Sequence, residues 1–206
     1  MSSLPAHEFV LKIASRCNLN CDYCYEYNLG DSSWLKQPVS MSAKVARQAA
    51  TRIAEHAREH RIPTVCISLH GGEPLSVGPG RLDEIATILR DAIGPHAKLE
   101  LGIQTNATLV TPEIISVLKR HSVAVGVSID GPERVNDLHR VTHGGKSSFD
   151  ETMNGIRALE EAGCLAGLLS VIDVSTDPLE VFEFVATLKI KHVDFLLPHY
   201  NWTRLP

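Results

Sequence analysis

Residues 9–25 read FVLKIASRCNLNCDYCY, an apolar run that leads directly into three cysteines, Cys17, Cys21 and Cys24. The run predicts a β-strand, and the C-x3-C-x2-C spacing puts the three thiols in the loop that follows it. Most cubane iron–sulfur clusters are held by four thiolates, so a site with three leaves one iron open to a small molecule that carries amine and carboxylate groups. We therefore expect an iron–sulfur cluster in this loop, and the open iron indicates chemistry rather than electron storage alone.

Other uses of these cysteines have to be weighed. A zinc site would need a fourth ligand, and only distant residues such as His7 or Cys66 could supply it. A disulfide would leave one odd thiol, and nothing in the sequence indicates an oxidising compartment. The remaining cysteines, Cys66 and Cys164, fall in or beside strand-like runs, so we expect both to be buried core thiols.

Strand-like and helix-like segments alternate along the rest of the chain. The expected strands are residues 9–14, 65–69, 99–104, 123–129, 165–172 and 193–197. Between them we expect helices, the first capped by Ser40 or Ser42 and two others beginning at Thr111-Pro112 and Asp177-Pro178. This alternation, with apolar strands that are covered on both faces, predicts a parallel sheet joined by right-handed crossovers.

The apolar periodicity of two helices predicts which side chains they bury. For the helix that ends near residue 59, these are Val45, Ala49 and Ile53. For the helix after Asp177-Pro178, they are Val181, Phe182, Val185 and Leu188.

Length and composition limit the possible function. A chain of 206 residues with 44% hydrophobic content can bury a full-sized core, and we expect one domain over residues 1–206. The net charge of −4 argues against a nucleic-acid partner, because binding one needs a large positive surface. No apolar run approaches the length of a membrane span, and residues 1–8 do not resemble a signal peptide, so we expect a cytoplasmic protein with no membrane partner.

Further motifs follow the expected strands. They are HGGEPL at residues 70–75, QTNATL at 104–109 and SIDGP at 128–132. Together with the cysteine loop and Tyr23 before its last cysteine, these motifs resemble the radical S-adenosylmethionine (SAM) superfamily, in the order seen in its peptide-modifying, SPASM-type members. Residues 9–12, 31–34 and 194–199 resemble maturases of the FxsB type, which are similar in class to the enzymes that form cyclophane cross-links in ribosomally made peptides.

The resemblance implies a fold and a set of cofactors. The fold would be an α/β, open and partial (β/α)6 barrel, like a TIM barrel but with too few strands to close. The cofactors would be a [4Fe–4S] cluster on Cys17, Cys21 and Cys24, and SAM at the open iron. The chain ends soon after the sixth strand, and no cysteine follows Cys164, so we expect a fragment or trimmed domain that lacks the cysteine-rich C-terminal region of such maturases.

The resemblance also implies roles for residues that contact SAM. In the turn Gly71-Gly72-Glu73-Pro74, the glycines would let the backbone approach a ligand and Glu73 would accept from the amino group of SAM. Ser128 and Arg140 would hold the carboxylate, Asn106 would lie near the ribose, and Asp130 would either hold the loop or contact the ligand. The residues alone leave other readings open. These are a plain turn for the glycines, turn or cap chemistry for Asn106 and Ser128, a solvated charge for Arg140, and hydrogen-bonded loop residues for His70 and His199.

The implied activity is reductive cleavage of SAM to a 5′-deoxyadenosyl radical that abstracts hydrogen from a ribosomal precursor peptide and leads to a C–C, cyclophane-like cross-link. A donor such as flavodoxin or ferredoxin would supply the electron. Two alternatives stay open, namely oxidation of a protein Cys or Ser of the sulfatase-maturating type, and a non-catalytic module that binds a cluster or zinc.

Overall fold

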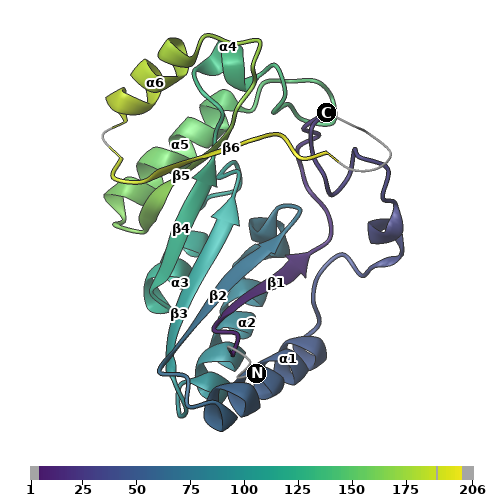
Figure 1. Ribbon diagram of the computed structural model, residues 1–206, viewed down its shortest axis with the longest axis vertical. Helices are drawn as coiled ribbons and strands as arrows, with labels where there is room; N and C mark the ends of the chain where they lie inside the picture. Colours follow the sequence, from purple (N-terminus) through teal and green to yellow (C-terminus); the bar gives the residue numbers. More distant parts are fainter. Residues whose placement is uncertain (1–4, 189, 201–206) are drawn as a thin grey trace.

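The computed structural model describes residues 5–188 and 190–200, and its centre is one sheet of six parallel strands. The strands are β1 (Glu8–Ala14), β2 (Thr64–Gly71), β3 (Lys98–Thr105), β4 (Val123–Ser128), β5 (Leu165–Val171) and β6 (Val193–Leu196). Each strand pairs in parallel with the next one along the chain, so the order in space is the order in sequence. The predicted α/β fold, an open six-stranded partial barrel, is confirmed (Figure 1).

The helices fill the connections between strands. They are α1 (Ala43–Glu59), α2 (Gly78–Ile93), α3 (Pro112–Arg120), α4 (Glu133–Asn136), α5 (Phe149–Glu161) and α6 (Pro178–Thr187), with short 3-10 helices η1 (Ser33–Lys36) and η2 (Pro74–Val77). Three of the caps follow the predicted chemistry, because the side chains of Ser42, Thr111 and Asp177 each accept a backbone N–H at the start of a helix. The first cap is thus Ser42 rather than Ser40.

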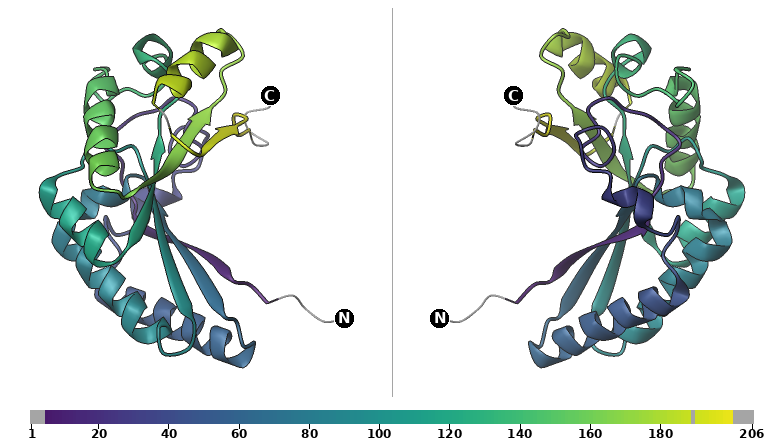
Figure 2. Two further views of the ribbon diagram at one scale, coloured as in Figure 1. Left: turned by 90° about the vertical axis from the view of Figure 1, so that its left-hand side faces the viewer. Right: turned by 90° about the vertical axis from the view of Figure 1, so that its right-hand side faces the viewer.

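The prediction that both faces of the sheet are covered is wrong. Figure 2 shows the helices on the convex side of a curved sheet, with a concave face opposite them. In β2 the side chains of Val65, Ile67 and Leu69 are buried, whereas Cys66 and Ser68 between them are half-buried. This alternation with a period of two is typical of a sheet with one apolar face, and it leaves the other face to line the lumen of the partial barrel.

Of the side chains predicted to be buried in these helices, Ile53 and Val181 are buried, Ala49, Val185 and Leu188 are half-buried, and Val45 and Phe182 are exposed. Val45 is 48% exposed, because α1 turns a stripe of alanines toward the core instead, including Ala46, Ala50 and Ala57. In α6, Val181 is buried but Phe182 is 63% exposed. The aromatic contact is made two residues later, where Phe184 packs on Phe149 of α5 with ring centroids 5.9 Å apart. Within residues 5–188 and 190–200, no helix is long and apolar enough to cross a membrane.

Candidate active site

A cavity lies at the carboxyl ends of the strands, where parallel α/β sheets gather their ligands. It brings together almost all of the residues predicted for the site, and those that line it are Cys17, Cys21, Tyr23, Cys24, Gly71, Gly72, Glu73, Asn106, Ser128 and Arg140. Two predicted residues lie behind its wall. Pro74 is buried at the start of η2, and Asp130 is buried after β4.

The loop that carries the three cysteines has only short turns of its own. The amide of Cys24 donates to the carbonyl of Cys21 over 3.0 Å, and that of Asn28 to the carbonyl of Cys24 over 2.8 Å. The side chain of Asn28 also donates within the loop, to Asn20 and to the carbonyl of Cys21. The contacts that tie the loop to the rest of the fold come from distant parts of the chain, such as the amide of Asn20 donating to the carbonyl of Val141 over 2.8 Å. Long-range contacts therefore decide where the thiols lie.

The three thiols fit a cationic iron cluster. None of them is in a disulfide, and burial raises the pKa of each, that of Cys17 to about 12. A buried thiol stays protonated unless a positive group stabilises the thiolate, and a bound metal deprotonates it outright. Three such thiols in one cavity thus form a donor set suited to iron.

The residues considered for a zinc site lie elsewhere. Cys66 is in β2 on the concave face, where its thiol contacts Glu100 at 3.7 Å, and the backbone carbonyl of His7 accepts from its amide. It is only half-buried, so the prediction of a buried core thiol is wrong for Cys66, because its register turns it to the lumen; it is confirmed for Cys164. Among the residues that the structure describes, no group of three or more His, Cys, Asp or Glu is placed to hold a single metal ion.

The Gly71-Gly72-Glu73 turn packs directly on the chain that enters the cysteine loop. A Cβ on Gly71 would meet the carbonyl oxygen of Ala14 at 2.1 Å, and one on Gly72 would meet that of Arg16 at 2.4 Å. The amides of Gly72 and Glu73 donate to these same carbonyls. The glycines are required here because backbone approaches backbone, which adds to the predicted approach to a ligand.

Glu73 is fully buried, and its carboxylate already accepts three hydrogen bonds. The donors are the amide of Leu75 at 2.8 Å, the hydroxyl of Thr105 at 2.7 Å and the amide of Asn106 at 2.8 Å. Burial nevertheless raises the pKa of Glu73 above its ordinary value. A carboxylate has about four acceptor positions, so one remains for a ligand that enters the cavity.

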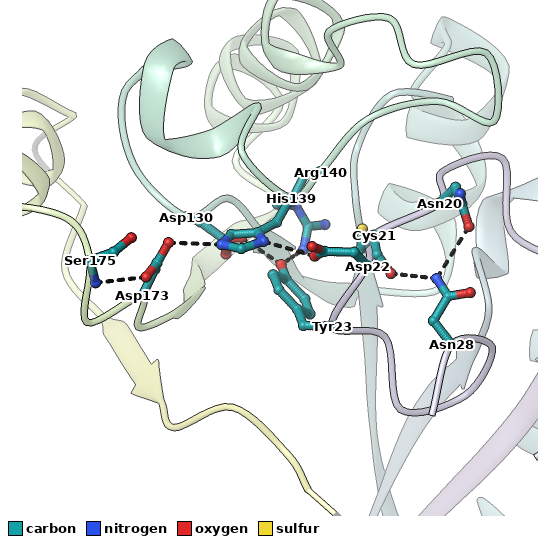
Figure 3. Close-up of polar contacts among 10 residues, drawn as sticks. All are labelled: Asn20, Cys21, Asp22, Tyr23, Asn28, Asp130, His139, Arg140, Asp173 and Ser175. Carbon is teal, nitrogen blue, oxygen red and sulfur yellow. Dashed lines mark hydrogen bonds and ion pairs between the residues drawn. The ribbon is translucent and has the colours of Figure 1, made fainter. Parts of the chain in front are cut away.

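Arg140 belongs to a buried network rather than to the surface. Its guanidinium donates to the hydroxyl of Tyr23 over 2.9 Å, and Tyr23 donates in turn to Asp130 (Figure 3). Burial raises the pKa of Tyr23, so its hydroxyl keeps the proton that this chain of bonds requires. The other carboxylate oxygen of Asp130 accepts from the amide of Val171 at the end of β5. Asp130 thereby holds the cysteine loop, which is one of the two roles that the sequence left open.

Asn106 and Ser128 both line the cavity, and both also have partners within the protein. Asn106 accepts from the amide and hydroxyl of Thr108, which is the turn chemistry foreseen as an alternative, and it donates to Asn18 over 3.0 Å. The hydroxyl of Ser128 accepts from Gln104 over 2.9 Å. Sequence reasoning did not single out Gln104, although the period of two puts it on the concave face beside Ser128.

His70 and His199 both line the same cavity. His70 is on β2 rather than in a loop, and burial lowers its pKa, which keeps the ring neutral. The ring of His199 lies 5.0 Å from that of Tyr25 in the cysteine loop. Sequence reasoning missed a third histidine, His139, which bonds two aspartates next to this network (Figure 3).

The family model that describes the radical SAM superfamily matches residues 11–185. The chain belongs to the radical SAM superfamily. Members of this family use a [4Fe–4S] cluster and SAM, so the cysteine loop and the cavity beside it form one cofactor site.

Sequence comparison relates this radical SAM chain to more specific enzymes. It is 29% identical over 193 residues to a serine-type anaerobic sulfatase-maturating enzyme of Bacteroides thetaiotaomicron, a match that covers 93% of this chain and 46% of the relative. It is 24% identical over 196 residues to the radical SAM cyclopropyl synthase TigE of Paramaledivibacter caminithermalis, covering 91% of this chain and 40% of that one. The chain thus spans about half the length of these relatives.

Solved structures support the fold. The protein anSMEcpe with bound AdoMet superposes with a TM-score of 0.82 at 22% identity, over 94% of this chain and 51% of the other. The same protein has been solved with AdoMet and a Cp18Cys peptide, and that structure gives a TM-score of 0.81. The comparisons include sulfatase-maturating enzymes and a cyclopropyl synthase, so the finer resemblance to FxsB-type, cyclophane-forming maturases stays a prediction.

Proposed function

We propose that this radical SAM chain is the radical-generating part of a maturase that acts on a side chain of a peptide or protein. One observation carries the proposal: the three thiols, the Gly-Gly-Glu turn and the polar ends of β3 and β4 line a single cavity. The same cavity is walled by Leu169, Val171 and Leu196 of β5 and β6, which face the lumen of the partial barrel. A substrate that reaches the cavity along the concave face would meet the cofactors directly.

The residues of the chain would bind and orient the cofactors. Cys17, Cys21 and Cys24 would hold the cluster, which together with SAM supplies the 5′-deoxyadenosyl radical when bound. The guanidinium of Arg140 and the hydroxyl of Ser128 would bind the carboxylate of SAM, because both lie in the cavity wall. The remaining acceptor position of Glu73 would take its amino group. Asn106 would lie near the ribose, and a donor such as flavodoxin or ferredoxin would deliver the electron.

The lumen would keep water from the radical. Its wall at β5 and β6 is apolar, and a bound peptide would close the open side of the sheet. Positioning a hydrogen atom of the substrate next to the radical is then the main contribution of the protein.

Two reactions at the substrate are supported by different observations. Residues 9–12 and 194–199 favour a C–C cross-link in a ribosomal peptide, through their resemblance to FxsB-type maturases. The sulfatase-maturating relatives favour oxidation of a Cys or Ser side chain. The relative TigE is named as a cyclopropyl synthase, a name that matches neither of these two reactions. Both reactions would begin with the same hydrogen abstraction.

Product analysis tests the proposal in two stages. The chain, reconstituted anaerobically with iron and sulfide and given SAM and a strong reductant, should form 5′-deoxyadenosine and methionine. Failure of a cluster-loaded chain to cleave SAM would overturn the proposal. Because the relatives are about twice as long, we expect coupled turnover of a precursor peptide only from an extended chain of about their length.

Mass spectrometry of the substrate separates the two reactions. Loss of two hydrogens within one short segment, with fragment ions missing inside that segment, indicates a cross-link. A product that carries an aldehyde derived from Cys or Ser indicates the sulfatase-maturating reaction. An unmodified peptide after SAM cleavage by the extended chain would exclude that peptide as the substrate.

A further inference from the structure

The two residues between Cys21 and Cys24 are each held by a different long-range contact. Tyr23 bonds Arg140 and Asp130, as described above. Asp22 bonds His139, the residue directly before Arg140. Two consecutive residues of the loop are thus matched to two consecutive residues that precede α5, and Figure 3 shows the contacts side by side.

His139 bridges two aspartates. Its Nδ1 lies 2.8 Å from Oδ1 of Asp22, and its Nε2 lies 2.9 Å from Oδ2 of Asp173. The conformation of Asp173 is restricted by its own turn, because its Oδ1 accepts from the amide of Ser175 over 2.8 Å. Both carboxylates only accept, so both ring nitrogens donate and the ring is an imidazolium. Burial by itself would lower the pKa of His139, but the bonds to Asp173 and Asp22 outweigh it and raise the pKa above its ordinary value.

The two aspartates that His139 bridges differ in exposure, and this difference suits the bridge to orient the loop. The side chain of Asp22 is 63% exposed, whereas those of His139 and Asp173 are only 23% and 18% exposed. An ion pair between two mobile exposed side chains contributes little, since both must be ordered to form it. Here His139 is already held by Asp173 and packs on Tyr23, with ring centroids 5.2 Å apart, so only Asp22 has to be ordered.

The geometry points to His139 as a positioning residue for the iron–sulfur cluster, one that orients the Asp22-Tyr23 spacer and thereby the Cys21 and Cys24 thiols. The turn between these cysteines is closed by the Cys24 amide bond to Cys21, and the Asp22 side chain leaves from its middle. Holding Asp22 fixes the rotation of that turn relative to the sheet. This role concerns the cofactor and holds for any substrate.

Hydrogen exchange tests the role without any activity measurement. The amides of Cys24 and Asn28 report on the loop, because both bond within it. We would follow them in the reconstituted chain and again after the iron has been removed with a chelator. In the metal-free chain, His139→Ala should speed their exchange by about fivefold to thirtyfold, the change expected when a contact of this kind is lost from a local opening equilibrium. Exchange in β3 and α2 should not change.

Two conservative variants separate the two arms of the bridge. The amide nitrogen of Asn can occupy the place of Nδ1, and that of Gln the place of Nε2. His139→Asn should therefore restore slow exchange through Asp22, whereas His139→Gln should keep only the Asp173 contact and resemble His139→Ala at the loop. A double-mutant cycle of Asp22→Ala with His139→Ala should show strong non-additivity, because either change removes the same contact, whereas Asp22→Ala should cost as much in the His139→Asn background as in wild type.

A spectroscopic measurement extends the test to the loaded protein. The electron paramagnetic resonance signal of the reduced cluster, recorded with and without SAM, should change in His139→Ala and His139→Gln, and recover in His139→Asn. The matched control is His121→Ala, which removes a histidine bonded to Asp83 over 2.8 Å in the helical layer. The control should leave both the signal and the loop exchange unchanged. Equal exchange at Cys24 and Asn28 in wild type and His139→Ala, or equal behaviour of the Asn and Gln variants, would overturn the proposal.

Discussion

A histidine–aspartate contact joins the cysteine loop to the rest of the fold and another lies in the helical layer, and the two contacts have different effects. His121 joins the turn after α3 to Asp83 of α2, two elements already held by buried apolar side chains such as Leu89 and Leu118. His139 joins a loop with only short turns of its own to the rest of the fold. The contact of His121 therefore adds little to the stability of the helical layer, where apolar packing dominates. The contact of His139 helps to set the position of the cysteine loop, which has few contacts of its own. Changes in the two regions should separate stability from cofactor binding.

The largest expected effect is the loss of a cluster ligand. Cys21→Ala should abolish the cluster, because three thiolates are needed to hold it and no other cysteine lines the cavity among the described residues. The helical layer does not depend on this residue, so thermal unfolding of the metal-free chain should be unchanged. Iron content and the visible absorption spectrum measure the outcome, with Cys66→Ala as the control that keeps the cluster. A dispensable Cys21 would refute the ligand assignment.

The next largest effect is expected for Glu73→Ala, which should lower both the stability of the fold and the affinity for SAM. It leaves three buried donors without their acceptor, and each such group costs about 1–3 kcal/mol. It also removes the acceptor proposed for the SAM amino group, which should weaken SAM binding by about tenfold to a hundredfold. Urea unfolding and isothermal titration of cluster-loaded protein measure the two effects. Unchanged SAM affinity with the cluster intact would remove Glu73 from the SAM site.

Leu89→Ala should lower the stability of the fold without changing the affinity for SAM. Leu89 is fully buried in α2, and truncation of such a side chain costs about 2–5 kcal/mol. Because Leu89 lies beneath the sheet and not in the cavity, SAM affinity of the folded, cluster-loaded variant should match wild type. This variant is thus the stability control for Glu73→Ala. Weaker SAM binding in Leu89→Ala would mean that the two regions are coupled after all.

The smallest effect should be a change in acid sensitivity at Asp83. Hydrogen bonds from His121 and Arg120 lower the pKa of its carboxyl in the folded chain. A lowered pKa means that the stabilisation is present above the ordinary pKa of about 4 and is lost as the pH falls through the folded value. Asp83→Asn should therefore flatten the fall in stability below about pH 4. Urea midpoints between pH 3 and 7 test this, and a wild-type slope in the variant would contradict it.

The sequence predicted the fold well because its signals are local. Apolar strand-like runs, capped helices and cysteine spacing are all properties of neighbouring residues. The errors arose where partners decide burial, as at Val45 and Phe182, which continue an apolar stripe in sequence but face solvent. Coverage of the second sheet face was also misjudged, since curvature of the sheet is a property of all six strands together.

For the site, the amino-acid sequence by itself determined which chemical groups are present and which strand ends carry them. The parallel order of the strands then brings those ends to one edge, so Cys17, Asn106 and Ser128 could be expected in one cavity, whereas Arg140 was expected there only through the family resemblance. Only the tertiary structure decided how each group is held. Three of the acceptor positions of Glu73 are taken by hydrogen bonds from within the protein, and Asp130 accepts from the hydroxyl of Tyr23. His139 meets an aspartate 117 residues away in the chain. Contacts between residues so far apart depend on the packing of the intervening strands and helices, which no local pattern encodes.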